Sequence, residues 1–240
     1  KPGDTVLDLG CGPANQLVQI ARLNPAANFI GIDASQKMLD LAHDNVIRCG
    51  VSNVAFQQGH MERLGQFSDV SIDGVISTMS LHHLPDMAAL RATCYEVRRI
   101  LKPDGALYFA DFGRLKRMAT QRFFAEDRKS TQPAIFTVDY FNSLRAAFSL
   151  RDLTEASHVL GDRVKIHKTF LVPFLVVAKT GQRHTLEIEK RAAARSMYAA
   201  LTPRQKYDLR DLSRFFRHGG LPLPFKPWQT TLHAIEPALQ

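Results

Sequence analysis

Short apolar runs rich in Val, Ile and Phe alternate, along the first half of the chain, with longer segments whose apolar positions recur every three to four residues. This alternation predicts β-strands joined by helices around a mostly parallel sheet. We expect strands over residues 5–9, 28–33, 54–58, 74–77 and 106–111, and helices over residues 15–23, 36–49 and 87–101. The residues between them suit these boundaries: Ser35 can cap a helix, Gly50 can end one, and residues 103–105 predict a turn.

The second half of the chain departs from this pattern. A basic, mixed segment covers residues 114–133, and a helical period follows over 138–148. Two strands are then expected over 150–157 and 164–179; because only a Gly-Asp turn joins them, they should be antiparallel. From residue 181 onward only helices are predicted, over 185–201 and 203–218, with Thr202 as N-cap and Gly219 past the end. The tail at 221–228 is too proline-rich for regular structure, and its Leu, Phe and Trp side chains should lie on another surface.

Composition limits the class of protein. The chain has 240 residues, of which 45% are hydrophobic and 22% charged, as in ordinary globular domains. Its three cysteines, Cys11, Cys49 and Cys94, lack the spacing of a zinc site or disulfide framework, which favours a reducing, cytoplasmic setting. The strongly apolar run at 169–178 is too short for a membrane span. The net charge of +8 favours anionic partners without by itself indicating nucleic acid. Because the chain opens without Met and a strand pattern begins at once, we expect further residues ahead of Lys1.

A glycine turn follows the first predicted strand, in the sequence Asp-Leu-Gly-Cys-Gly-Pro-Ala of residues 8–14. Open α/β sheets bind ligands at this place, but a lone Gly-x-Gly is weak evidence. Asn15 stands where a dinucleotide fingerprint needs Gly or Ala. The carboxylate of Asp8 would repel a pyrophosphate, yet it suits a ligand that carries an ammonium and a sulfonium. These residues favour S-adenosylmethionine over NAD. Asp33, at the end of the second predicted strand, can accept hydrogen bonds from ribose hydroxyls, or it can cap a helix beside Ser35.

Further motifs follow in order along residues 4–179. They are Gly-His-Met-Glu-Arg-Leu at 59–64, Asp-Gly-Val-Ile-Ser at 73–77, Leu-His-His-Leu-Pro-Asp at 81–86 and Arg-Ile-Leu-Lys-Pro-Asp-Gly at 99–105. Together with the glycine turn and Asp33, they resemble the class I S-adenosylmethionine-dependent methyltransferases. Within that family the chain is similar to small-molecule enzymes of the type 11 and type 25 kind, which include quinone and sterol methylating enzymes.

The resemblance implies a fold and a division of the chain. The expected fold is α/β: a Rossmann-like sandwich around a seven-stranded, mostly parallel sheet with one antiparallel strand, followed by a C-terminal helical extension. We expect a methyltransferase domain over residues 1–180 and the helical extension, with its proline-rich tail, over 181–240.

The resemblance also implies S-adenosylmethionine as cofactor and S-adenosylhomocysteine as product. Glycines 10 and 12 would lie against the methionine half, Asp33 against the ribose, and residues 60 and 61 against the adenine. The full set expected at the cofactor is Asp8, Gly10, Cys11, Gly12, Asp33, Ala34, His60, Met61 and Ser77. Two positions depart from the family. Ala14 replaces a third glycine, a mild change if that position faces into the helix. His60 replaces an Asp that accepts from the adenine amino group; a neutral imidazole can also accept, so binding should survive with altered affinity or pH dependence.

The methyl acceptor should arrive over the ends of the fourth and fifth strands. Methyl transfer is an in-line displacement that requires no metal, and no metal site is expected. His82, His83 and Asp111 are the candidates for removing a proton from the acceptor. In the alternative interpretation, the two histidines shape their loop and Asp111 bonds to a neighbouring segment. Residues 77–80 read Ser-Thr-Met-Ser and not Asn-Pro-Pro-Tyr, which disfavours methylation of the exocyclic amines of nucleic-acid bases, and the Pro-Cys pair expected of cytosine C5 enzymes is also absent.

The basic segment at 114–133 leaves two interpretations open. It could receive an anionic small molecule, an acyl-carrier partner or RNA, or it could be the solvated face of a helix whose buried side is Leu115, Met118 and Phe123. The second is favoured. The terminal helices could form a lid, or a homodimer surface finished by Trp228.

The leading functional hypothesis is methylation of a small organic acceptor, which could be anionic. The alternatives are an RNA or protein methyltransferase that uses the basic surface, with nucleic acid not favoured, and a non-catalytic S-adenosylmethionine-binding protein.

Overall fold

A single sheet of seven strands forms the centre of the computed structural model, which describes residues 1–221 and 223–229. The strands lie in the order β3-β2-β1-β4-β5-β7-β6. Neighbouring strands from β3 to β5 are parallel, whereas β7 is antiparallel to both β5 and β6. The expected seven-stranded sheet with one antiparallel strand is confirmed. The strands are β1 (Thr5–Leu9), β2 (Asn28–Asp33), β3 (Val54–Gln58), β4 (Ile72–Thr78), β5 (Leu101–Phe112), β6 (Lys165–Lys168) and β7 (Leu175–Lys179).

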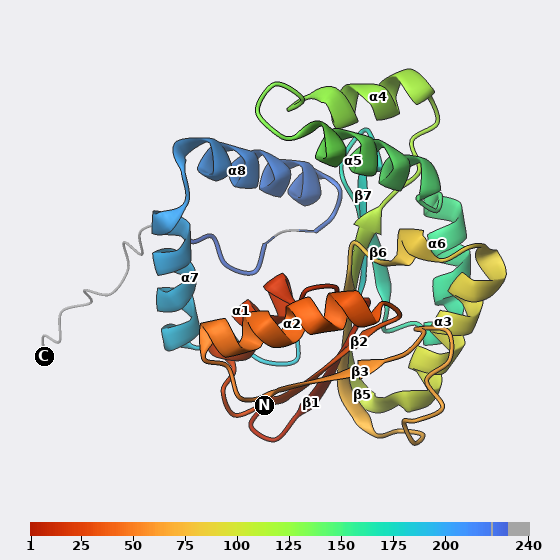
Figure 1. Ribbon diagram of the computed structural model, residues 1–240, viewed down its shortest axis with the longest axis vertical. Helices are drawn as coiled ribbons and strands as arrows, with labels where there is room; N and C mark the ends of the chain where they lie inside the picture. Colours follow the sequence, from red (N-terminus) through yellow and green to blue (C-terminus); the bar gives the residue numbers. More distant parts are fainter. Residues whose placement is uncertain (222, 230–240) are drawn as a thin grey trace, which may run out of the picture.

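Helices cover both faces of this sheet (Figure 1). They are α1 (Asn15–Leu23), α2 (Gln36–Cys49), α3 (Met87–Ile100), α4 (Met118–Glu126), α5 (Ala134–Ala146), α6 (Leu150–Ser157), α7 (Ile188–Ala200) and α8 (Pro203–His218). Short 3₁₀ helices occupy Leu81–His83 (η1) and His158–Leu160 (η2). One buried apolar cluster joins α1 and α2 to the sheet, and a second joins α3 and α6 to it. The result is the three-layer sandwich expected from the alternating pattern.

The segment at 150–157 is helix α6, so the strand expected there is wrong. Ser149 and Asp152 form a capping box, in which each side chain accepts from the other's backbone N–H. Leu153 and Ala156 are buried three residues apart on the face that meets α3. The antiparallel pair therefore comes entirely from the region expected as one strand at 164–179, which divides into β6 and β7.

Two other expectations need correction. Residues 103–105 do not form a turn ahead of β5, because they lie inside the strand, where its register against β4 shifts between Ile72 and Gly74. Such an irregularity accommodates extra residues in a continuous strand. The buried side of α4 was also mispredicted: Leu115 is buried, but Met118 and Phe123 are exposed, and Gln121 and Ala125 face inward instead.

The segment that follows β7 contacts β4 and the start of the chain. The guanidinium of Arg183 donates to the carbonyl of Asp73 and forms an ion pair with Asp4. In the tail, the rings of Trp228 and Tyr198 lie 5.7 Å apart, as expected of a tail that lies on another surface. Pro222 of this tail lies outside the described residues. In the part of the chain that the structure describes, no helix is both long and apolar enough to cross a bilayer.

Gly219 joins α8 to the edge strand. A Cβ on this glycine would lie 1.7 Å from the carbonyl oxygen of Lys168, far inside van der Waals contact. We therefore expect Gly219→Ala to lower the free energy of unfolding by about 2–3 kcal/mol, because backbone must move to relieve the overlap. Urea denaturation measures this. Gly65→Ala is the matched control, since open space surrounds its Cβ position, and an equal loss in both variants would contradict the prediction.

Candidate functional site

The chain reverses sharply at the carboxyl end of β1. Gly10 and Gly12 have φ values of 71° and 52°, and Ala14, the residue before α1, has φ 57°. A Cβ on Gly10 would lie 2.5 Å from the Cβ of Ser80, so this position requires glycine for space as well as for conformation. The side chain of Ala14 is fully buried against α1, but its left-handed backbone carries a strain of about 1–2 kcal/mol that a glycine would avoid.

Neighbouring strands hold this glycine loop in place. From the end of β4, the hydroxyl of Ser77 donates to the carbonyl of Leu9 at 2.9 Å, and the hydroxyl of Ser80 donates to that of Gly10 at 2.7 Å. The side chain of Ser77 is completely buried. In this structure the hydroxyl of Ser77 therefore braces the loop, and the expected contact of Ser77 with a cofactor stays a prediction.

Asp33, at the end of β2, also holds the loop. One carboxylate oxygen accepts from the backbone N–H of Gly12 at 2.8 Å, and the other accepts from the N–H of Ser35 at 2.9 Å. The two interpretations of this residue thus combine, since it fixes the start of α2 while it faces a ligand cleft. Each oxygen retains a lone pair that can accept a further hydrogen bond.

That cleft has a volume of about 450 Å³, including space open to solvent. It brings together five residues of the expected cofactor set, Gly10, Asp33, Ala34, His60 and Met61. The imidazole of His60 is 62% exposed at the rim and lies 3.7 Å from the carboxylate of Glu62. Sequence reasoning missed that Leu84 and Pro85 also line the cleft, because nothing in the pattern shows how the segment after β4 folds back.

Asp8 is a buried carboxylate behind the loop. Its side chain is 6% exposed, and burial, together with the nearby charge of Asp33, raises its pKa to about 7. Burial and these two carboxylates also raise the pKa of the Cys11 thiol, so this cysteine is not an activated thiolate. The concentration of negative charge favours a cationic ligand group.

His82 and Asp111 form a buried pair at the ends of η1 and β5. The imidazole Nδ1 of His82 lies 2.7 Å from a carboxylate oxygen of Asp111, and the two side chains are 4% and 2% exposed. The backbone N–H groups of His82 and Phe112 also donate to this carboxylate. These contacts match the interpretation in which Asp111 bonds to a neighbouring segment, and they bury both groups in this structure.

His83 has the opposite orientation. It lines the same cleft as Asp33, and its ring lies 4.2 Å from the ring of His82. Burial and the neighbouring His82 lower its pKa, although the carboxylates of Asp111, Asp139 and Asp33 act in the other direction. The neutral imidazole, which can accept a proton, therefore predominates at pH 7.

Half-buried aromatic rings continue from this histidine pair toward the cover formed by α4 and α5. The ring of Phe112 lies 5.4 Å from that of His82 and 5.4 Å from that of Tyr140. Phe174, between β6 and β7, stacks on Phe124 of α4 at 4.4 Å. We call Phe112, Phe124, Tyr140 and Phe174 the aromatic wall.

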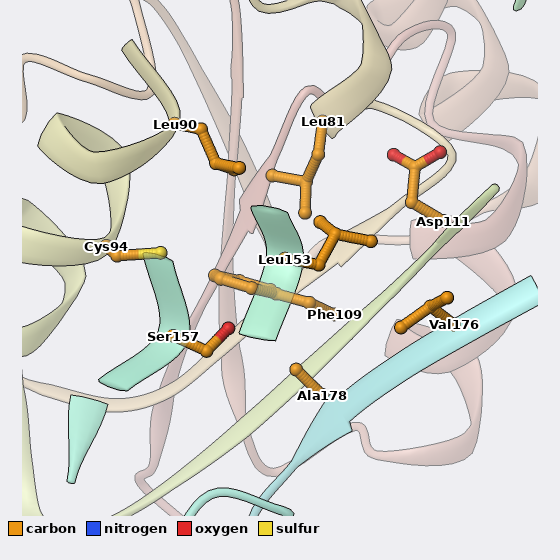
Figure 2. Close-up of a pocket in the computed structure, with 9 residues that line it drawn as sticks. All are labelled: Leu81, Leu90, Cys94, Phe109, Asp111, Leu153, Ser157, Val176 and Ala178. Carbon is orange, nitrogen blue, oxygen red and sulfur yellow. The ribbon is translucent and has the colours of Figure 1, made fainter. Parts of the chain in front are cut away.

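A second pocket lies on the other side of Asp111 (Figure 2). Its walls are apolar side chains of α3, α6, β5 and β7, among them Leu90, Phe109 and Leu153. Every residue that lines it is less than 9% exposed. An acceptor could enter only if α3 and α6 separated, so this space belongs to the packing of the core.

The basic segment is largely engaged within the protein. Arg128 forms an ion pair with Asp208 of α8, Lys129 with Glu126, and Arg114 donates to the carbonyl of Ala147. These contacts support the favoured interpretation of a solvated and braced face over an anion-binding patch. Among the described residues, no group of three His, Cys, Asp or Glu side chains could hold a metal ion.

Comparison with known proteins identifies the family. A family model described as a methyltransferase domain matches residues 1–159, about two thirds of the chain. The chain belongs to this methyltransferase family.

Curated relatives of this methyltransferase align over part of its length. It is 36% identical to a demethylmenaquinone methyltransferase of Lactobacillus johnsonii over 44% of the chain and 42% of the relative. It is 26% identical to a ubiquinone biosynthesis O-methyltransferase of Acinetobacter baylyi over 69% of the chain and 67% of the relative. The chain spans less than half the length of several curated relatives that it matches.

Solved structures share the fold of this methyltransferase. The YcgJ protein of Bacillus subtilis superimposes with a TM-score of 0.52 at 21% identity, over 85% of the chain and 80% of that protein. A SAM-dependent methyltransferase of Aquifex aeolicus gives 0.53 at 17% identity, over 75% and 84%. At these identities the likeness establishes the Rossmann-like sandwich alone.

The residues of this methyltransferase fit S-adenosylmethionine. No neighbour lies within 4 Å of the position that a Cβ on Gly12 would take, so a ligand can approach its backbone. Among the described residues, the hydroxyl of Thr78 at the end of β4 is a buried side-chain oxygen without a hydrogen-bond partner. The acidic surroundings of Asp8 suit the ligand's positive charges.

The raised pKa of Asp8 makes a prediction about stability. A carboxyl whose pKa is about 7 in the folded state and 3.8 when unfolded contributes a penalty that grows as the pH rises from about 4 to 7. Asn resembles the protonated acid, so Asp8→Asn should raise the free energy of unfolding of the ligand-free protein by about 2–4 kcal/mol at pH 8, and by much less at pH 5.

Urea denaturation at both pH values measures the effect. Asp73→Asn is the control with the opposite sign: burial raises the pKa of Asp73, but hydrogen bonds from Lys102 and the N–H of Thr5 outweigh it and lower the pKa. That variant should lose stability at pH 8. A gain for Asp8→Asn that did not depend on pH would contradict the prediction.

Proposed function

We propose that this chain transfers the methyl group of S-adenosylmethionine to an oxygen of a small organic acceptor. The observation that carries the proposal is one cleft lined both by Asp33, at the place where open α/β sheets bind nucleotides, and by His83, an imidazole in its proton-accepting form. The ubiquinone biosynthesis O-methyltransferases among the relatives support an oxygen acceptor.

In this proposal, the residues around the glycine loop hold the cofactor. Asp33 accepts from the ribose hydroxyls, the backbone of Gly10 and Gly12 admits the methionine half, and Asp8 faces its ammonium group. Ala34, His60 and Met61 lie against the adenine side. When bound, the cofactor supplies a methyl group that its sulfonium already activates for displacement.

His83 is the group that receives the acceptor's proton. Its imidazole faces the cleft in neutral form, so it can take the proton of a hydroxyl while the new bond between oxygen and methyl carbon forms. The buried His82 and Asp111 act as positioning residues, because their hydrogen bonds fix η1 and with it the direction of His83.

The aromatic wall favours an acceptor with a flat apolar body. The series of rings begins beside His82 and extends away from the cleft. The rings are half-buried, so they can contact a ring system of the acceptor while losing little side-chain conformational entropy. Arg128 and Lys129, the nearby cations, already form ion pairs within the protein, which disfavours an anionic acceptor.

Binding of the cofactor tests the proposal first. Titration calorimetry of the full chain should detect both S-adenosylmethionine and S-adenosylhomocysteine. Asp33→Ala should weaken both by about 10- to 100-fold, because it removes hydrogen bonds to the ligand and the anchor of the Gly12 N–H. Asp40→Ala, which alters an exposed carboxylate on α2, should bind as the parent does. Absence of binding by the parent chain would refute the assignment.

Turnover tests the role of His83. With a panel of phenols and hydroxyquinones as acceptors, His83→Gln should lower the rate of S-adenosylhomocysteine release by about 10²- to 10⁴-fold, with product affinity nearly unchanged. The parent's rate should rise with pH through an imidazole pKa below 6.5, and the variant should lack that limb. His184→Gln changes an exposed histidine outside the cleft and serves as control. Equal pH profiles in parent and variant would exclude His83 as the base.

A further inference from the structure

An exposed leucine occupies a tight turn between β6 and β7. Leu171 has φ 64° and is 79% exposed, and the N–H of Val172 donates to the carbonyl of Phe170 at 2.8 Å, two residues back. A three-residue turn with a positive central φ is rare and strained, and a bulky side chain adds to the strain. Gly or Asn at this position would avoid both the backbone strain and the exposed apolar side chain. Folding therefore does not explain why a leucine stands here.

The turn is held rigidly in this shape. The hydroxyl of Thr169 donates to the carbonyl of Val172 at 2.6 Å, and it accepts from the N–H of Leu175 at 3.1 Å. Phe170 and Val172, which flank the leucine, are 44% and 36% exposed. The fold therefore presents three consecutive apolar side chains to solvent on a fixed support.

The C-terminal end of α8 extends this surface. The N–H of Phe170 donates to the carbonyl of Phe215 at 3.0 Å, and the side chain of Phe215 is 41% exposed. The rings of Phe170 and His218 lie 5.7 Å apart. In Figure 1 the connection between β6 and β7 lies with α4, α5 and α8 at the end of the molecule away from the N-terminus. We call Phe170, Leu171, Val172 and Phe215 the apolar tip.

Cationic residues lie close to the apolar tip along the chain. Lys168 precedes the turn, and Arg214 and Arg217 lie within two residues of Phe215 on α8; all three are exposed. Within residues 1–221 and 223–229, neither Lys168 nor Arg217 forms an ion pair, and Arg214 reaches only Asp211, at 3.9 Å. The cations are therefore available to an external anion, in contrast to Arg128 and Lys129 of the segment at 114–133.

We propose that the apolar tip and its cations dock this protein on an anionic lipid bilayer. Exposed Leu and Phe side chains can insert at the boundary of headgroups and acyl chains, while Lys and Arg beside them attract anionic headgroups. Charge complementarity carries this choice, since three exposed cations without a close acidic partner lie within a few residues of side chains that gain from leaving water. RNA would use the cations but would leave Leu171 exposed, and a second copy of this chain would bring the same positive charge to the contact.

Sedimentation with lipid vesicles tests the docking without any cofactor or acceptor. The full chain should bind vesicles of phosphatidylcholine mixed with phosphatidylglycerol, bind pure phosphatidylcholine vesicles at least tenfold more weakly, and dissociate as salt rises. Leu171→Asn should lower the affinity about tenfold. Because Asn tolerates the left-handed conformation, this variant should melt no lower than the parent, which separates lost docking from lost folding. Arg217→Gln should lower the affinity about fivefold.

Matched controls make each outcome decisive. Ile47→Gln changes a 78% exposed aliphatic residue on α2 and should leave vesicle binding unchanged. Calorimetry with S-adenosylhomocysteine should give the same affinity for Leu171→Asn and the parent, so that failure of docking and failure of the proposed function remain distinguishable. The proposal is wrong if the parent does not bind anionic vesicles, or if Leu171→Asn binds them as well as the parent does. It is equally overturned if the tip proves to serve tRNA binding or self-association, with no vesicle binding.

Discussion

The reversal of the chain after β1 is the constraint on which the rest of the site depends. Left-handed backbone is strained at Ala14 but not at Gly10 and Gly12, and donors and acceptors from other elements fix the loop in this one shape. Two serine hydroxyls reach the loop from the end of β4, and the carboxylate of Asp33 reaches it from β2. Since β1 lies between these two strands, the order of the sheet decides the shape of the loop. The order of the strands therefore determines the geometry of the candidate ligand site.

The buried carboxyl of Asp8 has an electrostatic cost in free energy that the requirements of folding do not explain. A carboxyl buried as deeply as Asp8 prefers its neutral form, and the charge of Asp33 strengthens that preference. A core built for stability alone would place an uncharged residue there. A bound cation reverses the balance, because it favours the ionised carboxylate that the empty protein disfavours. The strained backbone of the loop and the buried carboxyl of Asp8 thus lie at the same end of the sheet, where binding of a ligand can offset the free energy that they cost.

Sequence periodicity predicted the first four parallel strands well, because each is a short apolar run with a clear end, but it placed the start of β5 five residues too late. It failed at α6, where eight residues fit either period and the capping box of Ser149 decided the outcome. The sequence predicted which residue types form the site, but it did not predict the direction in which each side chain points. A 3₁₀ turn directs His82 into the core and His83 into the cleft, and no pattern in two adjacent histidines shows that. The bracing role of Ser77 likewise depends on which face of β4 meets the loop.

The contacts that hold α4 and α5, the cover over the site, differ from those that hold the glycine loop. Contacts of α4 and α5 with the rest of the protein include the stacking of Phe124 on Phe174 and the ion pair of Arg128 with Asp208. Exposed ion pairs contribute little, and a stacked ring pair adds only about 1 kcal/mol, so these two contacts hold the cover weakly. None of these contacts involves the glycine loop or Asp33. Under the function proposed above, movement of the cover admits an acceptor while the cofactor side keeps its geometry, because separate sets of contacts hold the two halves of the site.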